Sequence, residues 1–293
     1  MDINSSLTFL QLKGGTGKST LIASMAHCAA SIEGWTTVIV DLDANSPIIA
    51  AVLGDLQNSN TVIDALERVA EGNQLDDLLV PAPAYGTNTY LLPSDVSGIR
   101  SELVEFIPDL ISELKRTYIG DNPVDFVLVD TPANIEDVNI QVLAGVDYVA
   151  MPMSFSGADV STARRTVGFI TYSQNKRPKA LKFHGFVPTM VRNNGSIDKL
   201  VVGDKSKNFV TDLIGSRMLL PFIPVSEHLR GTFLRSSKDG GVTPLSFAPR
   251  SAASARLMAL WQALRSSNPD RDLYEVELRH QIGLNAEENN GAQ

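Results

Sequence analysis

The sequence predicts an α/β fold with a single, doubly wound and mostly parallel sheet that is covered by helices on both faces. Short apolar runs alternate with amphipathic segments over most of the 293-residue chain. Such alternation is typical of parallel sheets, because parallel neighbours need a crossover segment between them. A glycine-rich turn directly follows the first apolar run, where such folds bind ligands. We expect one domain over residues 1–268 and a tail over residues 269–293.

The predicted strands are short runs of β-branched and other apolar residues. Strands that are buried on both faces read as continuous apolar runs, because neither face meets water. The run before Asp130 is the clearest example. We expect strands over Leu7–Leu12, Thr37–Val40, Thr89–Leu92, Phe126–Val129, Tyr148–Met151, Phe183–Val187 and Met218–Leu220.

The predicted helices lie between these strands and carry apolar residues at helical spacing. Thr61 is suited to cap one of them, and Pro108 is expected to kink or break another. The expected helices are Ser19–Ser31, Thr61–Ala70, Ser101–Tyr118, Ile135–Leu143, Val160–Tyr172, Lys199–Ile214 and Ala252–Leu264. In the tail, we expect Leu273–Leu284 to be partly helical and the polar end to be disordered.

Composition is that of a soluble globular protein, with 43% hydrophobic and 20% charged residues. The single cysteine, Cys28, excludes a disulfide framework and a cysteine-held zinc or iron–sulfur site within one chain. No apolar stretch reaches transmembrane length, and no basic leader precedes an apolar run. We therefore expect a cytoplasmic protein in a reducing compartment.

Charge is divided unevenly along the chain. Residues 1–150 hold 6 Lys or Arg and 21 Asp or Glu, whereas residues 151–268 hold 17 and 6. The formal net charge of −8 taken alone argues against nucleic acid. The basic second half, however, could bind a polyanion by neutralising its phosphates. The alternative is that two opposite fields orient subunits or keep the protein soluble.

A phosphate-binding loop is the most specific motif in the sequence. The general pattern is a glycine, four residues, and then Gly-Lys-Ser or Gly-Lys-Thr. Leu12 stands where the first glycine belongs, so the loop is a variant. Glycines let backbone N–H groups close around phosphates, and the helix N-terminus adds a favourable dipole. We expect Lys18 to contact the β- and γ-phosphates and Ser19 to ligate Mg²⁺. The expected nucleotide-binding residues are Gly14, Gly15, Thr16, Gly17, Lys18, Ser19 and Thr20.

The segment Lys13–Thr20 (KGGTGKST) resembles the deviant Walker A loop of the ParA/MinD family of P-loop ATPases. That family carries a signature lysine directly before the glycine pair, and Lys13 stands at that position. The resemblance implies ATP as the nucleotide and a homodimer with ATP sandwiched at its interface. It also implies that Lys13 reaches the nucleotide of the other subunit, so that Lys13 and Lys18 are both catalytic.

Three aspartates complete the resemblance. Asp41-Leu42-Asp43 resembles the family's Asp-x-Asp, although the Pro-Gln that usually follows is absent here. Strand alternation would place both side chains on one face. The resemblance implies that Asp43 is catalytic, positioning or activating the attacking water. The apolar run ending at Asp130 looks like the Walker B segment, which implies a Mg²⁺ contact through water. The expected metal-site residues are Ser19, Asp41 and Asp130.

The second half of the chain carries weaker resemblances. Pro221–Glu227 resembles the loop that borders adenine in this family, and Pro188–Arg192 is expected to form the opposite wall. The implied contacts are Met190, Pro224 and Val225. ParA-type members use basic residues of this half to bind DNA without sequence preference. We expect DNA contacts from Arg217, Arg230, Arg235 and Lys238.

The expected function is therefore that of a short ParA-type ATPase on the nucleoid. It would hydrolyse ATP slowly, be stimulated by a ParB-like or other partner, and partition or position a plasmid, a chromosome or a protein assembly. One alternative is a MinD-like regulator on the membrane. Membrane binding needs a basic amphipathic helix, and Leu273–Leu284 carries two glutamates and few basic residues, so we expect no membrane contact. Another is a weakly catalytic switch that mainly docks partners.

Overall fold

The computed structural model describes residues 1–44, 60–95, 98–133, 137–154, 157–176, 181–191, 221–230, 232 and 242–266. Within them, one sheet has the strand order β3-β4-β2-β7-β1-β8-β9. Its strands pair in parallel except for β3, which lies antiparallel to β4 at the edge. This topology confirms the predicted fold class. The strands are β1 (Ser5–Phe9), β2 (Thr37–Asp41), β3 (Val80–Pro81), β4 (Thr89–Leu92), β7 (Phe126–Asp130), β8 (Tyr148–Met153) and β9 (Lys182–Pro188).

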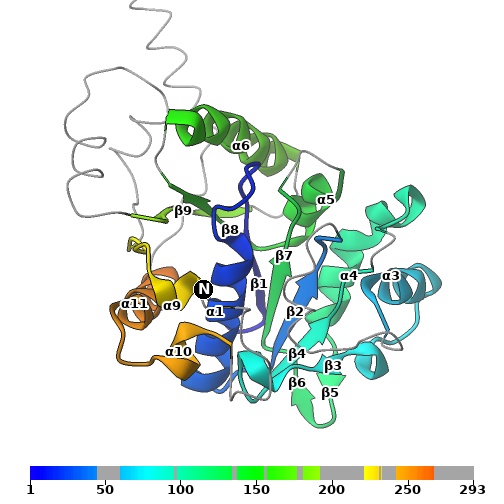
Figure 1. The fold of residues 1–293 in the computed structure, drawn as a ribbon. Coiled ribbons are helices and arrows are strands. Elements are labelled where there is room, and N and C mark those ends of the chain that lie inside the picture. Colours follow the sequence, from blue (N-terminus) through cyan, green and yellow to red (C-terminus); the bar gives the residue numbers. More distant parts are fainter. Residues whose placement is uncertain are drawn as a thin grey trace, which may run out of the picture.

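Helices cover both faces of this sheet, as Figure 1 shows. Alternate residues of a central strand pack into two separate hydrophobic cores, because successive side chains point to opposite faces of the sheet. In β2, Val38 and Val40 join the core beneath α3, α4, α5 and α6, whereas Ile39 joins the core beneath α1, α10 and α11. The helices are α1 (Lys18–Ile32), α3 (Val62–Glu71), α4 (Ile107–Leu114), α5 (Asp137–Gly145), α6 (Gly157–Lys176), α9 (Glu227–Arg230), α10 (Pro244–Phe247) and α11 (Ala252–Ser266).

Two local predictions, for Thr61 and for Pro108, concern helix boundaries. Thr61 caps α3 through a capping box, in which its backbone N–H donates to Asp64 over 2.7 Å. Pro108 marks the predicted break in the helix expected over Ser101–Tyr118 rather than a kink within it, because α4 begins at Ile107. It lies in the first turn of α4, where proline costs no helical hydrogen bond. The six residues before α4 form a 3₁₀ helix, Ser101–Phe106.

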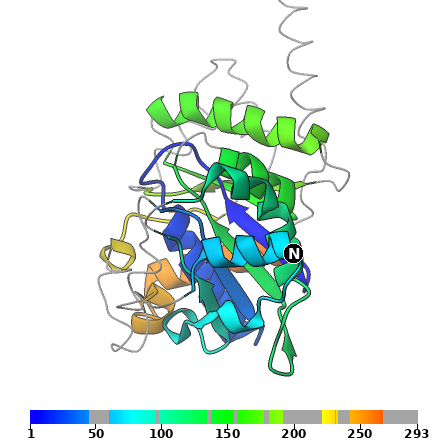
Figure 2. The same ribbon diagram turned by 90° about the vertical axis from the view of Figure 1, so that its right-hand side faces the viewer.

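The predicted helix over Ser101–Tyr118 was wrong at its C-terminal end. The α4 helix stops at Leu114, and the chain then forms a hairpin of β5 (Tyr118–Ile119) and β6 (Asn122–Pro123). Gly120 makes the turn with a φ of 60°, a conformation that glycine adopts readily. The hairpin projects from the end of the sheet opposite α6 in both views (Figures 1 and 2). The predicted elements Lys199–Ile214, Met218–Leu220 and Leu273–Leu284 lie outside the described residues.

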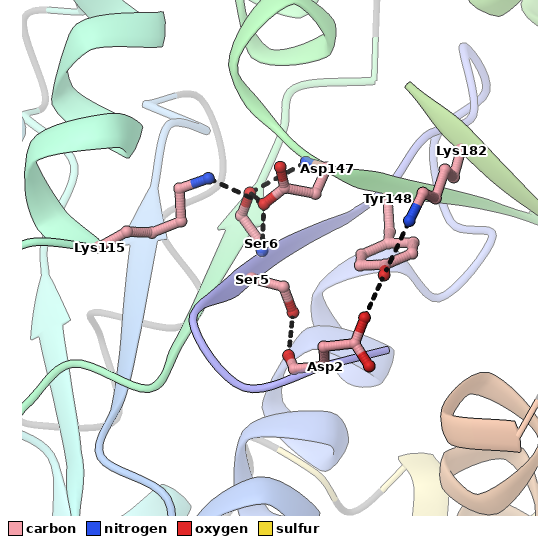
Figure 3. A network of polar contacts seen from close by, with 7 residues as sticks. All are labelled: Asp2, Ser5, Ser6, Lys115, Asp147, Tyr148 and Lys182. Atoms are coloured by element: carbon pink, nitrogen blue, oxygen red, sulfur yellow. Dashed lines mark hydrogen bonds and ion pairs between the residues drawn. The ribbon is translucent and has the colours of Figure 1, made fainter. Parts of the chain in front are cut away.

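A polar network ties together the beginnings of three strands (Figure 3). The Asp147 carboxylate accepts hydrogen bonds from the Ser6 N–H and hydroxyl over 3.0 and 2.9 Å, and from Lys115 over 2.8 Å. Burial alone would raise the pKa of Asp147. The Lys115 ammonium and Ser6 outweigh it and hold that pKa below its ordinary value. The network thus fixes the end of the sheet that lies away from the phosphate-binding loop.

The buried His184 on β9 should make stability fall in mild acid. Its ring is fully buried and stacks on Tyr148 at a centroid distance of 4.9 Å. Burial lowers the pKa of His184 to about 3, so in the folded protein the ring stays neutral over most of the acid range. The unfolded chain takes up this proton below about pH 6.5. The contribution of His184 is therefore complete above about pH 6.5 and is lost progressively as the pH falls toward 3.

We expect the free energy of unfolding to lose about 2 kcal/mol through His184 between pH 6.5 and 5. Urea denaturation at several pH values measures it, and His184→Phe should remove this part of the slope. His228→Phe is the matched control, because His228 is exposed, and it should keep the wild-type slope. Equal slopes for the wild type and His184→Phe would show that this histidine does not carry the effect.

Candidate functional site

The loop between β1 and α1 has the backbone of a phosphate cradle. Gly15 and Gly17 have φ angles of 73° and 94°, in the left-handed region that favours glycine. An added Cβ would meet nothing within 4 Å at either position, so conformation rather than space requires glycine there. Gly17 precedes α1 and supplies no side-chain cap. The first N–H groups of the helix therefore remain available to an anion.

A cavity of about 500 Å³ opens over this loop. The predicted nucleotide-binding residues surround it: the whole loop from Gly14 to Thr20 on one side, and Met190, Pro224 and Val225 on the other. Asp43 also reaches it, from the segment after β2. Among the described residues, its lining is Gly14, Gly15, Thr16, Gly17, Lys18, Ser19, Thr20, Leu21, Asp43, Ala133, Thr189, Met190, Ile223, Pro224, Val225, Ser226, Leu229 and Arg230.

The second wall of the cavity is held by backbone pairing. Val191 bridges to Pro224 in parallel fashion, and the Val225 N–H donates to the Val191 carbonyl over 3.1 Å. Phe222 is held from α11 by the Arg256 guanidinium, which lies 4.1 Å from the ring centroid. Met190 has a φ of 55°, a strained value for a residue that is not glycine, and is 47% exposed. This wall presents apolar side chains on a braced backbone, as a site for a flat base requires.

Lys18 is the buried cation of the cavity. Only 7% of its surface is exposed. Burial lowers the pKa of Lys18, while the nearby carboxylates of Asp130 and Asp43 raise it in part. The Lys18 ammonium is therefore largely desolvated by the protein itself. An anion in the cavity would meet a charge that has little solvation left to lose.

Asp130 is buried at the end of β7, beside the loop. Burial raises the pKa of this carboxyl group, and a hydrogen bond from Ser19 and the charge of Lys18 oppose the shift. Its Oδ1 is buried and makes no hydrogen bond within the described part of the chain. Magnesium prefers oxygen ligands and keeps several waters. A carboxylate oxygen without a protein partner, next to the Ser19 hydroxyl, therefore fits a hydrated Mg²⁺ ion.

The strand-face argument for Asp41 and Asp43 was wrong. The β2 strand ends at Asp41, which pairs in register with Asp130 and is fully buried. Asp43 lies beyond the strand, where its N–H donates to Asp41 Oδ1 over 3.1 Å. Of the two aspartates, only Asp43 lines the cavity. Asp41 and Asp130 lie side by side at the ends of β2 and β7.

Lys13 and the predicted DNA contacts have other outcomes. Lys13 is half-buried and does not line the cavity. Of the predicted DNA contacts, Arg217, Arg235 and Lys238 fall outside the described residues. Arg230 is exposed at the end of α9 and lines the same cavity as the phosphate-binding loop. Its position therefore gives it access to a bound nucleotide, a role that the sequence did not predict.

Thr189 lies within the predicted wall Pro188–Arg192 and lines the cavity, although it was not among the predicted nucleotide contacts. It is 3% exposed, and its hydroxyl makes no hydrogen bond among the described residues. A buried hydroxyl without a partner is costly unless a ligand or water satisfies it. Its place at the end of a predicted strand was the available signal, since parallel sheets bind ligands there. Leu229 and Ala133 were not predicted either, and no motif marks them.

The described helices include none that is both long and apolar enough to cross a membrane.

Comparison with known proteins identifies the family. The family model for the CobQ/CobB/MinD/ParA nucleotide binding domain matches residues 7–234. The chain is 25% identical over 265 residues to the chromosome-partitioning ATPase Soj of Treponema pallidum, which covers 87% of this chain and 94% of Soj. It is also 25% identical over 205 residues to the septum site-determining protein MinD of Bacillus subtilis, covering 69% of this chain and 72% of MinD.

Solved structures agree on the fold. A ParA family ATPase from Chlorobium tepidum superposes with a TM-score of 0.65 at 19% identity, covering 89% of this chain and 96% of that one. The MinD protein of Pyrococcus horikoshii, solved with Mg-ADP, gives 0.64 at 19% identity, with coverage of 89% and 96%. The family match agrees with the phosphate-binding loop and the buried aspartates, which are features of a nucleotide-binding site. The chain belongs to the CobQ/CobB/MinD/ParA nucleotide binding domain family, and within it to the ParA/MinD ATPases.

Proposed function

We propose that this protein is an ATP-driven switch that dimerises on ATP, binds DNA without sequence preference, and hydrolyses ATP to partition or position a cargo. The observation that carries the proposal is the cavity itself. It places a desolvated lysine, Lys18, and a carboxylate, Asp43, at one phosphate cradle. A bound triphosphate would therefore meet a cation on its terminal phosphates and a carboxylate suited to direct water.

Mg²⁺ belongs to this proposal. Ser19 and Asp130 would hold it, with Asp41 next to Asp130. When bound, the ion would offset negative charge on the phosphates. Around it, Lys18 holds the phosphates, the first N–H groups of α1 face the anion, and Asp43 orients a water at the cavity edge.

Lys13 supports the dimeric form of the switch. It belongs to the loop yet does not line the cavity of its own chain. A lysine in that position can serve a nucleotide held by a second copy, where its charge would stabilise the transferring phosphoryl group. Nucleotide binding by one chain would then depend on Lys18, whereas catalysis by the dimer would also depend on Lys13.

DNA is the proposed ligand of the dimer. The excess of Lys and Arg in residues 151–268 supplies the charge, and phosphate neutralisation would supply most of the affinity. Arg217, Arg235 and Lys238 remain the proposed contacts. Arg230 is proposed with them, although its place at the cavity also allows it to respond to nucleotide. A ParB-like partner would stimulate hydrolysis and release the DNA.

The experiment that tests this function is DNA binding measured against salt with ATP, with ADP and without nucleotide. We expect tight binding with ATP alone, and a steep fall in affinity as salt rises. Arg235→Ala should weaken binding to every DNA sequence about equally and reduce the salt slope by about 1. Absence of DNA binding under all three conditions would reject the DNA-binding function.

A membrane-surface function is the second candidate, because MinD of Bacillus subtilis is as similar in identity as Soj is. Flotation with liposomes of anionic lipid, with ATP or ADP, separates the two functions. Co-flotation that requires ATP would favour the membrane, and ATP-dependent DNA binding without flotation would favour the nucleoid.

A further inference from the structure

The base of the phosphate-binding loop is tied to neighbouring elements by one buried side chain. Gln11 follows β1, precedes the loop, and is fully buried. Its Oε1 accepts the N–H of Leu12 over 2.9 Å and the hydroxyl of Thr166 over 2.9 Å. Its Nε2 faces the Pro152 carbonyl of β8 at 3.4 Å. The amide of Gln11 therefore joins the loop, the sheet and one helix in a single cluster.

Thr166 brings helix α6 into this cluster. It is fully buried, and it shares the buried face of α6 with Ala163, Val167 and Ile170. Its hydroxyl also lies 3.5 Å from the Leu12 N–H, and it can donate instead to the Thr162 carbonyl at 3.1 Å. In both views the loop, drawn in dark blue, lies next to α6 (Figures 1 and 2). The contact spans 155 positions of sequence.

The Leu12 N–H lies one peptide bond before Lys13, so the direction of this N–H limits the path of the chain into Lys13. The two side chains that contact the Leu12 N–H are fully buried and the N–H itself is partly buried, so water compensates only in part for a lost partner, and unsatisfied buried groups are costly. We propose that Gln11 and Thr166 are positioning residues, which fix the Lys13 segment of the loop and make its order depend on helix α6. The catalytic part of this inference rests on the role proposed above for Lys13.

The two lysines of the loop should respond differently to a change at Thr166. Lys18 belongs to α1 and faces the cavity, so loss of the Thr166 contact should leave its hold on a nucleotide intact. Lys13 lies next to Leu12, so its placement should suffer first. Loss of the Thr166 hydroxyl should therefore lower kcat for ATP hydrolysis more than it lowers the affinity for nucleotide.

Hydrogen–deuterium exchange on the nucleotide-free, full-length chain tests the coupling directly. We expect Thr166→Val to speed exchange of peptides that span residues 10–17 by about fivefold, as loss of one net hydrogen bond predicts. Thr166→Ser keeps the hydroxyl and should restore slow exchange. Thr171→Val is the matched control, because Thr171 is buried on the same helix and its hydroxyl has no hydrogen-bond partner among the described residues.

Steady-state kinetics give the second readout. Thr166→Val should lower kcat for ATP about fivefold and leave the Kd for ADP unchanged, whereas Thr171→Val should change neither. Equal exchange in the two valine variants would overturn the coupling. Faster exchange with an unchanged kcat would overturn the positioning of Lys13. If the wild type does not turn over ATP, the proposed function fails, and the exchange comparison still decides the coupling.

Discussion

Lys18→Met should abolish nucleotide binding, with affinity for ADP and ATP falling at least about 100-fold. The wild-type ammonium is 7% exposed and lies at the cavity with the N-terminus of α1. Charge-assisted hydrogen bonds to phosphate are strong there, because little water competes. Methionine keeps much of the apolar stem but removes the charge. Isothermal titration calorimetry with ADP measures the loss without requiring hydrolysis.

Two further variants make the Lys18 result interpretable. Lys18→Met also removes a cation that stabilises the ionised Asp130, so a thermal unfolding scan must show that the variant is folded. Lys18→Arg keeps a charge and should retain more affinity than the methionine variant. Lys176→Met removes an exposed lysine at the end of α6 and should bind ADP as the wild type does. Wild-type affinity in Lys18→Met would refute the assignment of the phosphate site.

Asp43→Ala should slow ATP hydrolysis by about 100-fold or more while nucleotide binding stays close to that of the wild type. Asp43 is the carboxylate that reaches the cavity from the segment after β2. A positioned carboxylate that orients water typically contributes 10²- to 10⁴-fold to the rate. It does not bind the phosphates, because like charges repel, so its loss should not weaken ATP binding. Phosphate release under single-turnover conditions measures the effect.

The control for Asp43 is a carboxylate of equal charge at the other end of the sheet. Asp121 is exposed in the β5–β6 turn, and Asp121→Ala should hydrolyse ATP at the wild-type rate. If Asp43→Ala also turned over ATP normally, another group would have to direct the water.

Much of the fold could be predicted because its signals are local. The five-residue strands β2 and β7 are continuous apolar runs that end at aspartates, and Thr61 followed by Asp64 is a capping pattern that sequence alone displays. The phosphate-binding loop is local as well, since glycine, lysine and serine spacing define it within a few residues. Family membership follows from these same residues.

The remaining features depend on contacts between distant parts of the chain. Asp43 was expected on a strand face, but the strand stops at Asp41, and the Asp43 N–H donates to the Asp41 carboxylate. Arg230 was expected on a DNA-binding face, and the packing of α9 brings it to the cavity. Gln11 and Thr166 meet across 155 positions. Periodicity carries no information about such pairs, because it reports the environment of one element at a time.

The mass of the Asp43→Ala protein in solution, with ATP and with ADP, shows whether ATP drives dimerisation. This variant should retain ATP, so sedimentation velocity should show a dimer with Mg-ATP and a monomer with Mg-ADP. Adding Lys13→Ala should return the ATP-bound sample to a monomer, because this variant loses the lysine that we propose reaches the nucleotide of the second copy. A monomer under both nucleotides in a variant that binds ATP would contradict the account.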